Sequence, residues 1–396
     1  MKEPTATNHE KPTSGKRNYT TLVCLCICVA FAAYLLLHTL LFLVTPDLEK
    51  SENENRTLQQ KPKLTISALA DGSYMDKFET YLTDQFPNRD GLISFHSFFA
   101  SLVGHREQNG VYLGKRAFLF EQQTPLDEET LQKTTDAINS FLEREKHAQS
   151  AMILAPNSSY VLQNYLPYHL REDDQKEQLN TVKKALSGEK FSWISVLKSY
   201  ENVEDKTTLY YRTDHHWTTP AAFRAFLSLS SKWDLGAKSS QFKTEPVSDH
   251  FSGTLAASYG ERKTRDVLYA CAPKNAAGTY TVNYTSQNKV TTSVFDTEKL
   301  NQKNQYELFL GGNFDKIEIT TLSESGNTLL LFKDSYANCL IPMLTPYFAK
   351  IVIIDPRYFS DSLGDVLEDT DFTHILFVYN LNTFLADKSL AGVLSS

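Results

Sequence analysis

One long apolar segment near the start of the chain contrasts with the alternating pattern elsewhere. No charged residue occurs between Arg17 and Asp47, and residues 21–44 are apolar except for two threonines and His38. A helix over this segment would be about 36 Å long, which exceeds the roughly 30 Å core of a bilayer. A buried core helix is usually shorter, and a cleaved signal peptide has a shorter apolar core followed by small residues. The pattern therefore predicts an uncleaved transmembrane anchor.

The charges on either side of this segment predict its orientation. Four basic residues precede it and two follow it closely, namely Lys2, Lys11, Lys16 and Arg17 before it and Lys50 and Arg56 after it. The positive-inside rule then makes residues 1–20 a cytoplasmic tail and exports the rest of the chain. The interpretation is a single-pass protein of the cell membrane, with a polar stalk at 45–64 and an extracellular domain at 65–396.

Shorter apolar runs in the exported part predict buried strands, because they are brief and rich in branched residues. They are Met152–Ala155, Leu209–Tyr211, Leu329–Phe332, Ile351–Ile354 and Ile375–Tyr379. Amphipathic stretches around residues 131–142 and 179–186 predict helices. The alternation indicates an α/β fold, with a mostly parallel sheet and helices on both faces. Residues 236–325 are rich in Thr, Asn, Gly and Tyr, which predicts an inserted β-rich region that shapes a groove.

Composition changes this picture in two ways. The chain has 41% hydrophobic and 22% charged residues, which are globular values, and a net charge of −7, which disfavours a nucleic-acid partner. Its mean hydropathy of −0.35 is typical of a soluble protein, because averaging over the whole chain hides the apolar segment. Three of the five cysteines, at positions 24, 26 and 28, fall in the predicted anchor. Whether Cys271 and Cys339 pair is left open.

Two short polar motifs follow predicted strands. The first is Thr213-Asp214-His215-His216-Trp217-Thr218, placed between the run at 209–211 and a helix that Thr219-Pro220 would open. The second is Lys333-Asp334-Ser335-Tyr336, placed between the run at 329–332 and a short helix that Pro342 would end. Loops at the carboxyl edge of an open α/β sheet carry its active site. A serine on such a turn also lies beside backbone N–H groups that can stabilise an oxyanion.

Together the motifs contain the parts of a Ser–His–Asp triad, in which the imidazole takes the serine proton and the carboxylate orients the imidazole. Three alternatives remain. The adjacent histidines and Asp214 would suit a metal, but no further metal-ligand spacing accompanies them. A metal-dependent phosphoesterase with an Asp-His-His signature would need upstream Asp motifs, which are missing. A purely structural role, with a capped helix and a buried Trp217, explains one motif but not both.

In combination, these motifs resemble the DHHW family of bacterial exported proteins. The resemblance also rests on four further segments, Glu54-Asn55-Arg56, Asp84-Gln85-Phe86-Pro87-Asn88-Arg89-Asp90, Asn109-Gly110-Val111-Tyr112-Leu113-Gly114 and Asp355-Pro356-Arg357-Tyr358-Phe359. That family is similar to the alginate O-acetyltransferases, whose catalytic domain resembles an SGNH hydrolase. The resemblance implies a three-layer SGNH-hydrolase-like sandwich with a circularly permuted parallel sheet.

The resemblance also implies roles for individual residues. Asp214 would be the orienting acid, His216 the base and Ser335 the nucleophile, with His215 the weaker candidate for the base. The permuted order makes Asn380 a candidate oxyanion side chain, although capping a loop would equally explain it. Arg357, Tyr336 and Trp217 are expected to bind substrate. Other aromatic residues, Tyr306 among them, are candidate stacking faces for sugar rings or simply core. Lys333 stands where the SGNH signature has glycine.

The predicted function is an exported, membrane-anchored O-acyltransferase, with acetyl as the expected group, that modifies a cell-surface polysaccharide or cell-wall polymer. It would need no metal or organic cofactor. Its acyl group would come through the membrane from a membrane-bound O-acyltransferase, as the resemblance implies. A carbohydrate esterase with the same triad and a non-catalytic module of polysaccharide export are the alternatives.

Overall fold

The computed structural model describes residues 14–51, 56–168, 170, 175–261, 263–274 and 280–395. Most of the expected cytoplasmic tail, and the Glu54-Asn55 part of one motif, therefore lie outside the described residues. The chain divides into two compact units. The first comprises residues 1–51 and 56–92, and the second comprises 52–55 and 93–396.

The first unit contains the apolar segment. Helix α1 (Ser14–Val44) includes a stretch, Tyr19–Val44, with a mean hydropathy of 2.5 and no burial, so it is long and apolar enough to cross a membrane. Beyond it, two short strands pair antiparallel and two helices follow, namely β1 (Lys50–Ser51), β2 (Arg56–Thr57), α2 (Ile66–Ala70) and α3 (Ser73–Asp84). The Tyr81 hydroxyl donates to both oxygens of Asp47 at 3.1 Å, which ties the segment after α1 to α3.

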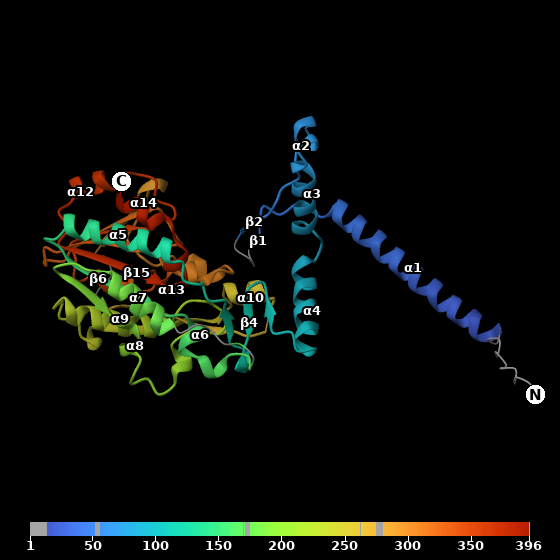
Figure 1. Ribbon diagram of the computed structural model, residues 1–396, viewed down its shortest axis with the longest axis horizontal. Helices are drawn as coiled ribbons and strands as arrows, with labels where there is room; N and C mark the ends of the chain where they lie inside the picture. Colours follow the sequence, from blue (N-terminus) through green and yellow to red (C-terminus); the bar gives the residue numbers. More distant parts are fainter. Residues whose placement is uncertain are drawn as a thin grey trace, which may run out of the picture. The chain divides into compact units, whose positions relative to one another are not determined.

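An eight-stranded mixed sheet forms the centre of the described part of the second unit (Figure 1). Its strand order is β11-β10-β12-β14-β13-β15-β6-β7. Five neighbouring strands are parallel, namely β6 (Gln149–Ala155), β7 (Phe191–Ile194), β13 (Thr328–Lys333), β14 (Lys350–Ile354) and β15 (His374–Asn380). Three antiparallel strands extend it, namely β10 (Tyr280–Tyr284), β11 (Lys289–Thr291) and β12 (Lys316–Thr321).

Alternation along the parallel strands produces two apolar layers. In β13, Leu329 and Leu331 join one core cluster, while Leu330 and Phe332 join the other. The first cluster includes α9 (Thr219–Lys232) with α8 (Val196–Ser199) beside it. The second includes five helices, α5 (Glu128–Arg144), α7 (Gln175–Ala185), α12 (Leu363–Asp369), α13 (Leu381–Ala386) and α14 (Ser389–Ser395). Helices thus cover both faces, and the predicted α/β class is confirmed.

The order of the parallel strands places the two motifs near each other. Counted from β13, the five strands follow the order 2-1-3-4-5, a common doubly wound order whose ligand site lies between the first and third strands. Those two strands are β13 and β15, and Ser335 follows the first of them. The inference that this order arose by circular permutation stays a prediction.

Three local predictions are wrong. Residues 209–211 form no strand: they contribute only an isolated bridge between Tyr210 and Trp217, and the parallel edge strand is instead β7. Thr218 rather than Thr219 caps α9, because its side chain accepts from the Ala221 N–H. Pro342 lies in the first turn of α11 (Ile341–Leu344), where its missing N–H has no cost, so it begins a helix instead of ending one.

Two smaller antiparallel sheets and a short helix lie outside the central sheet among the described residues of the second unit. Strands β8 (Phe242–Phe251) and β9 (Asp266–Pro273) pair antiparallel, so the region 236–325 is β-rich as expected. A small three-stranded sheet contains β3 (Glu107–Gln108), β4 (Val111–Leu113) and β5 (Leu119–Glu121). Helix α10 (Thr254–Tyr259) packs on that sheet through Leu255, Ala256 and Tyr259.

Candidate active site

Hydrogen bonds to Asp266 in β9 and to Tyr336 fix the loop that carries Asp214, His215 and His216. Thr213 donates from its backbone N–H and its hydroxyl to Asp266 Oδ2, at 2.8 and 2.6 Å. The indole Nε1 of Trp217 donates to the carbonyl of Tyr336 at 3.0 Å. In return, the Tyr336 hydroxyl donates to the carbonyl of His215. The two motifs therefore hold each other by reciprocal hydrogen bonds, although 119 or more residues separate them.

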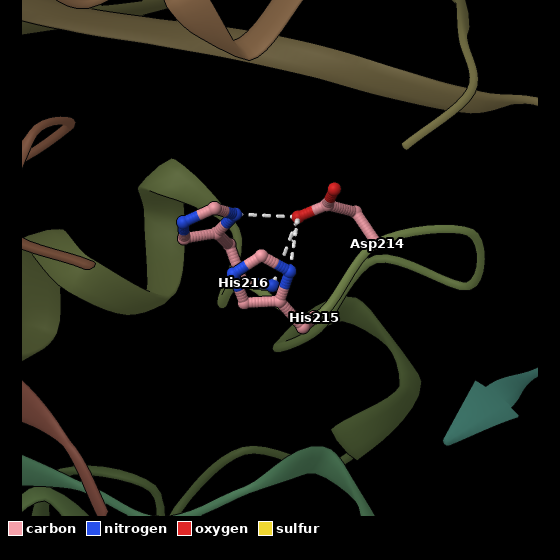
Figure 2. A group of neighbouring side chains, drawn as sticks. All are labelled: Asp214, His215 and His216. Atoms are coloured by element: carbon pink, nitrogen blue, oxygen red, sulfur yellow. Dashed lines mark hydrogen bonds and ion pairs between the residues drawn. The ribbon is translucent and has the colours of Figure 1, made fainter. Parts of the chain in front are cut away.

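A chain of short hydrogen bonds connects the acid, the imidazole and the serine. Nδ1 of His216 lies 2.5 Å from Asp214 Oδ1, and Nε2 of the same ring lies 2.8 Å from Ser335 Oγ. The first distance is shorter than that of an ordinary N–H···O hydrogen bond, and the second is of ordinary length. Dashed lines in Figure 2 mark the contacts between the histidines and Asp214. The structure thus brings together the three side chains that were predicted to form a triad, with His216 rather than His215 between the other two. Their roles in catalysis stay a prediction.

The Asp214 carboxylate is buried, and both of its oxygens accept hydrogen bonds. Oδ1 accepts from the His216 N–H at 3.0 Å, and Oδ2 accepts from the Thr254 N–H at 2.9 Å. Burial by itself would raise the pKa of Asp214, but His216, His215 and these hydrogen bonds together hold it below the ordinary value. The Thr254 N–H belongs to the first turn of α10, where a carboxylate is stabilised. Asp214 is therefore ionised and fixed in orientation.

His216 is neutral in this environment. Burial lowers the pKa of His216 to about 4, and neighbouring His215 acts in the same direction, while Asp214 opposes both. The phenol ring of Tyr306 stacks on the imidazole, with centroids 3.8 Å apart and planes at 14°. A neutral imidazole with Asp214 on Nδ1 has its Nε2 lone pair free for the serine proton.

Ser335 begins a short 3₁₀ turn, Ser335–Ala337, directly after β13. The buried side chain of Asp334 shapes this turn, since it accepts from the Tyr336 N–H at 2.9 Å and from the Asn380 N–H at 2.8 Å. Burial raises the pKa of Asp334 above its ordinary value. No partner for the backbone N–H of Ser335 is found within the described ranges. That N–H group is available to an oxyanion formed at Ser335.

A buried ion pair lies beneath the turn. Lys333, which stands where the SGNH signature has glycine, is fully buried and donates to Asp355 Oδ2 at 3.2 Å and to Asn313 Oδ1 at 3.0 Å. Arg357 binds both oxygens of Asp355, at 2.8 and 2.7 Å. Because its guanidinium binds Asp355 and its side chain is only 30% exposed, Arg357 has a smaller surface for substrate than expected.

Asn380 caps a helix. Its Oδ1 accepts from the Asn382 N–H at 2.9 Å at the start of α13, and its Nδ2 lies 3.2 Å from Asn157 Oδ1 and 3.3 Å from the Ala155 carbonyl. Both ends of the amide are therefore engaged. The capping alternative fits this geometry better than the expected oxyanion role.

Two further expectations about substrate contacts do not fit the structure. Trp217 is completely buried and Tyr336 is 1% exposed, so neither side chain presents a surface to a substrate. Their polar atoms instead tie the two motifs together. Tyr306, a candidate for stacking on sugars, stacks on His216.

Asp214, His215 and His216 also lie close enough to suit a metal ion, with their ligand atoms within 4.8 Å of one another (Figure 2). Both nitrogens of His216, however, already have protein partners in Asp214 and Ser335. The Nδ1 atom of His215 lies 2.8 Å from the Thr254 hydroxyl. A metal would have to break these contacts, and the donor set therefore fits an acid–base site better. The absence of a metal stays a prediction.

Sequence reasoning missed Gly253 and Thr254. Gly253 lies so close to the acid that a Cβ there would be 2.2 Å from the Asp214 side chain. Thr254 supplies the N–H that orients Asp214. Neither residue belongs to an apolar run or a chemical motif, so no sequence signal marked them.

The fold matches solved structures. A DHHW family protein from Eubacterium siraeum superposes with a TM-score of 0.60 at 21% identity, over 73% of this chain and 96% of that one. Bacillus cereus PatB1 with a sulfonyl adduct gives 0.60 at 17% identity, over 70% and 98%. The O-acetyltransferase domain of Pseudomonas putida AlgJ gives 0.47 at 14% identity, over 72% and 95%. No curated protein matches the sequence.

The family comparison agrees with the motifs. Residues 182–354 match the family described as DHHW protein, and this range contains Asp214, His216 and Ser335. The resemblance to the DHHW family that was inferred from the sequence is therefore confirmed over residues 182–354.

Proposed function

We propose that this protein is an exported, membrane-anchored O-acyltransferase that acetylates hydroxyl groups of a cell-surface polysaccharide or cell-wall polymer. The observation that carries the proposal is the continuous contact from Asp214 through His216 to Ser335, at 2.5 and 2.8 Å. This arrangement suits nucleophilic catalysis by a serine.

The reaction would proceed in two halves. His216 Nε2 takes the proton as Ser335 Oγ attacks the acyl carbonyl, and the bond from acyl carbon to leaving group breaks as His216 returns the proton to that group. An acceptor hydroxyl then attacks the acyl-Ser335 ester and loses its proton to His216. The new ester leaves, and the proton returns to Ser335 Oγ. Asp214 stabilises the imidazolium in both halves.

The acyl source follows from the proposed topology. With α1 spanning the membrane and its amino end in the cytoplasm, Ser335 faces the outside, where acetyl-CoA is absent. A membrane-bound O-acyltransferase would pass the acyl group across, as the family resemblance implies. The fold shared with PatB1, whose structure carries a sulfonyl adduct, supports the choice of a sulfonylating reagent as a probe.

The test uses the full chain in lipid nanodiscs with p-nitrophenyl acetate, with and without candidate acceptor glycans. We expect nitrophenol release, an acetyl group on the Ser335 peptide, and transfer to a glycan. Ser335→Ala should reduce the rate of nitrophenol release by about 10³-fold or more. The control Ser286→Ala, at an exposed serine, should leave this rate unchanged. Equal release by the wild type and Ser335→Ala would exclude the triad.

A second pair of variants separates the adjacent histidines. His216→Ala should abolish labelling of Ser335 by a sulfonyl fluoride, whereas His215→Ala should retain most of it. Acetyl-Ser335 that is hydrolysed at the same rate with every glycan would identify an esterase instead. If neither the acetyl ester nor the sulfonyl fluoride labels Ser335, the protein would be identified as a non-catalytic module.

A further inference from the structure

Helix α4 (Arg89–Leu102) presents its large apolar side chains to the outside of the second unit. The residues of this outer face are Phe95, Phe98, Phe99, Leu102 and Val103, and they are 63, 51, 49, 64 and 76% exposed. Scattered single apolar residues on a surface are ordinary, but four on one helix face and a fifth, Val103, directly after the helix form a continuous patch. Their spacing of three and four residues places them on one side of the helix.

The opposite side of α4 faces its own domain and consists mainly of small residues. Ser97 is buried there, and its hydroxyl is 2.6 Å from the carbonyl of Tyr259 and 2.8 Å from Gln108 Oε1. A Cβ on Gly260 would approach Ser97 Oγ to 2.6 Å, so only glycine allows this close approach. These contacts prevent α4 from rotating to bury its phenylalanines. The usual amphipathic arrangement of a surface helix is therefore reversed.

We propose that the outer face of α4 inserts into the headgroup region of the outer leaflet of the membrane. The proposal rests on the proposed anchoring by α1 but not on the chemistry of Ser335. Only 44 residues, 45–88, separate the end of α1 from the start of α4. The tether keeps α4 at a high local concentration near the bilayer, so a weak contact suffices to hold it there.

Charge around the outer face favours a lipid surface as the occupant. Lys263 Nζ lies 5.7 Å from the centre of the Phe98 ring, and three further exposed basic side chains lie in or just after α4 in the sequence, namely His96, His105 and Arg106. Glu107 and Glu261, by contrast, accept hydrogen bonds from backbone N–H groups. Phenylalanine and leucine bordered by basic residues are typical of helices that lie in an anionic membrane interface.

The test places the photocrosslinker p-benzoylphenylalanine at Phe99 in the full chain, reconstituted in vesicles of phosphatidylcholine and phosphatidylglycerol. A matched position is Tyr358, an aromatic residue that is 54% exposed on a different element. We expect a phospholipid adduct at position 99 and at least fivefold less at 358. A crosslinked dimer would instead identify a second copy as the occupant, and a crosslinked internal peptide would identify another segment of this chain. Either result, or equal lipid labelling at both positions, would overturn the proposal.

A second variant separates this contact from folding and from the reaction. With the crosslinker moved to Leu102, the double change Phe95→Glu and Phe99→Glu should reduce the lipid adduct at least fivefold, while α1 still holds the chain in the vesicle. Labelling of Ser335 by a sulfonyl fluoride in detergent should be unchanged, which shows that the variant is folded. Lipid adducts that persist in the double variant would contradict the proposal. Because crosslinking does not require Ser335, it also remains informative if the proposed reaction fails.

Discussion

At the scale of single residues, the protonation of His216 sets the pH range of the site. Burial lowers the pKa of His216 to about 4, so the imidazole stays neutral well below the 6.5 of an ordinary histidine. Protonated His216 cannot accept the Ser335 proton, and the reaction rate should fall only as the pH drops through about 4. The rate of sulfonylation of Ser335 between pH 3.5 and 8 measures this midpoint. A midpoint near 6.5 would show that water reaches the imidazole.

Tyr306 positions the imidazole, although it was expected only as a core or sugar-stacking residue. Its ring lies 3.8 Å from that of His216, and its hydroxyl donates to the Ser335 carbonyl at a long 3.3 Å. Tyr306→Phe keeps the ring and should slow sulfonylation about fivefold or less. Tyr306→Leu removes the stack, and we expect about tenfold slower labelling with a pH midpoint shifted toward 6.5. Equal rates and pH midpoints for both variants would show that the stack has no such role.

The sequence predicted which side chains form the candidate triad better than it predicted their surroundings. Asp214, His216 and Ser335 lie within short motifs whose chemistry is recognisable without coordinates. The sequence could not decide between two roles for Asn380 and did not reveal the burial of Tyr336, because capping and burial depend on what lies opposite a side chain in space. Thr254 acts through its backbone N–H, which every residue except proline has, so its identity could not reveal it.

At the scale of elements, the start of α10 fixes the orientation of the acid. The φ of Gly253 is −87°, so alanine fits its backbone, and the three atoms nearest to the new Cβ all belong to the Asp214 side chain, with its Cβ and Oδ2 both at 2.2 Å. Gly253→Ala should displace that carboxylate and reduce Ser335 labelling by about 100-fold while the protein remains folded. The control is Gly392→Ala in α14, where nothing lies within 4 Å of the new Cβ. Unchanged labelling in Gly253→Ala would mean that Asp214 does not orient His216.

Strand β15 makes the fold sensitive to acid. Burial lowers the pKa of His374 to about 4, and its ring packs against Trp233 and Phe348 with centroids 4.8 and 5.2 Å apart. The unfolded chain binds a proton near pH 6.5, so it gains protons over the folded state as the pH falls from 6.5 to 4. His374 should therefore reduce the free energy of unfolding by roughly 3 kcal/mol across this interval.

Urea unfolding followed by tryptophan fluorescence at pH 7 and pH 4 measures this loss. His374→Phe keeps the ring shape and removes the titrating group, so its loss of stability should be smaller than that of the wild type by roughly 3 kcal/mol. Other titrating groups act equally in both proteins and cancel in the difference. Identical losses would show that His374 is protonated in the folded state or that its burial is incomplete.

The strands illustrate what a hydrophobic pattern can and cannot predict. Runs at 152–155, 329–332, 351–354 and 375–379 lie in central parallel strands, which are buried on both faces and therefore read as continuous apolar sequence. β7 is an edge strand with three half-buried residues, and its Phe-Ser-Trp-Ile sequence contains no such run. The apolar triplet at 209–211 is a buried loop, which a short run cannot distinguish from a strand.

At the scale of the whole molecule, the α/β class followed from the alternation of strands and helices, whereas the strand order required coordinates. The exported orientation of the second unit is still a prediction from charge. In protoplasts of a bacterial host, external protease should remove a C-terminal epitope tag and leave an N-terminal tag intact. Protection of the C-terminal tag until the cells are lysed would show the opposite orientation and would exclude an extracellular acceptor.

Helix α10 joins two features of this molecule. At its first residue, the Thr254 N–H holds Asp214, and at its last residue, the Tyr259 carbonyl accepts from Ser97 on α4. The helix has six residues, a length of about 9 Å. If α4 rests on the bilayer, this one short helix sets the height of Ser335 above the lipid. Acceptor hydroxyls would then be selected partly by their distance from the membrane surface. Polymer segments that are just leaving the membrane would reach Ser335, and segments farther out would not.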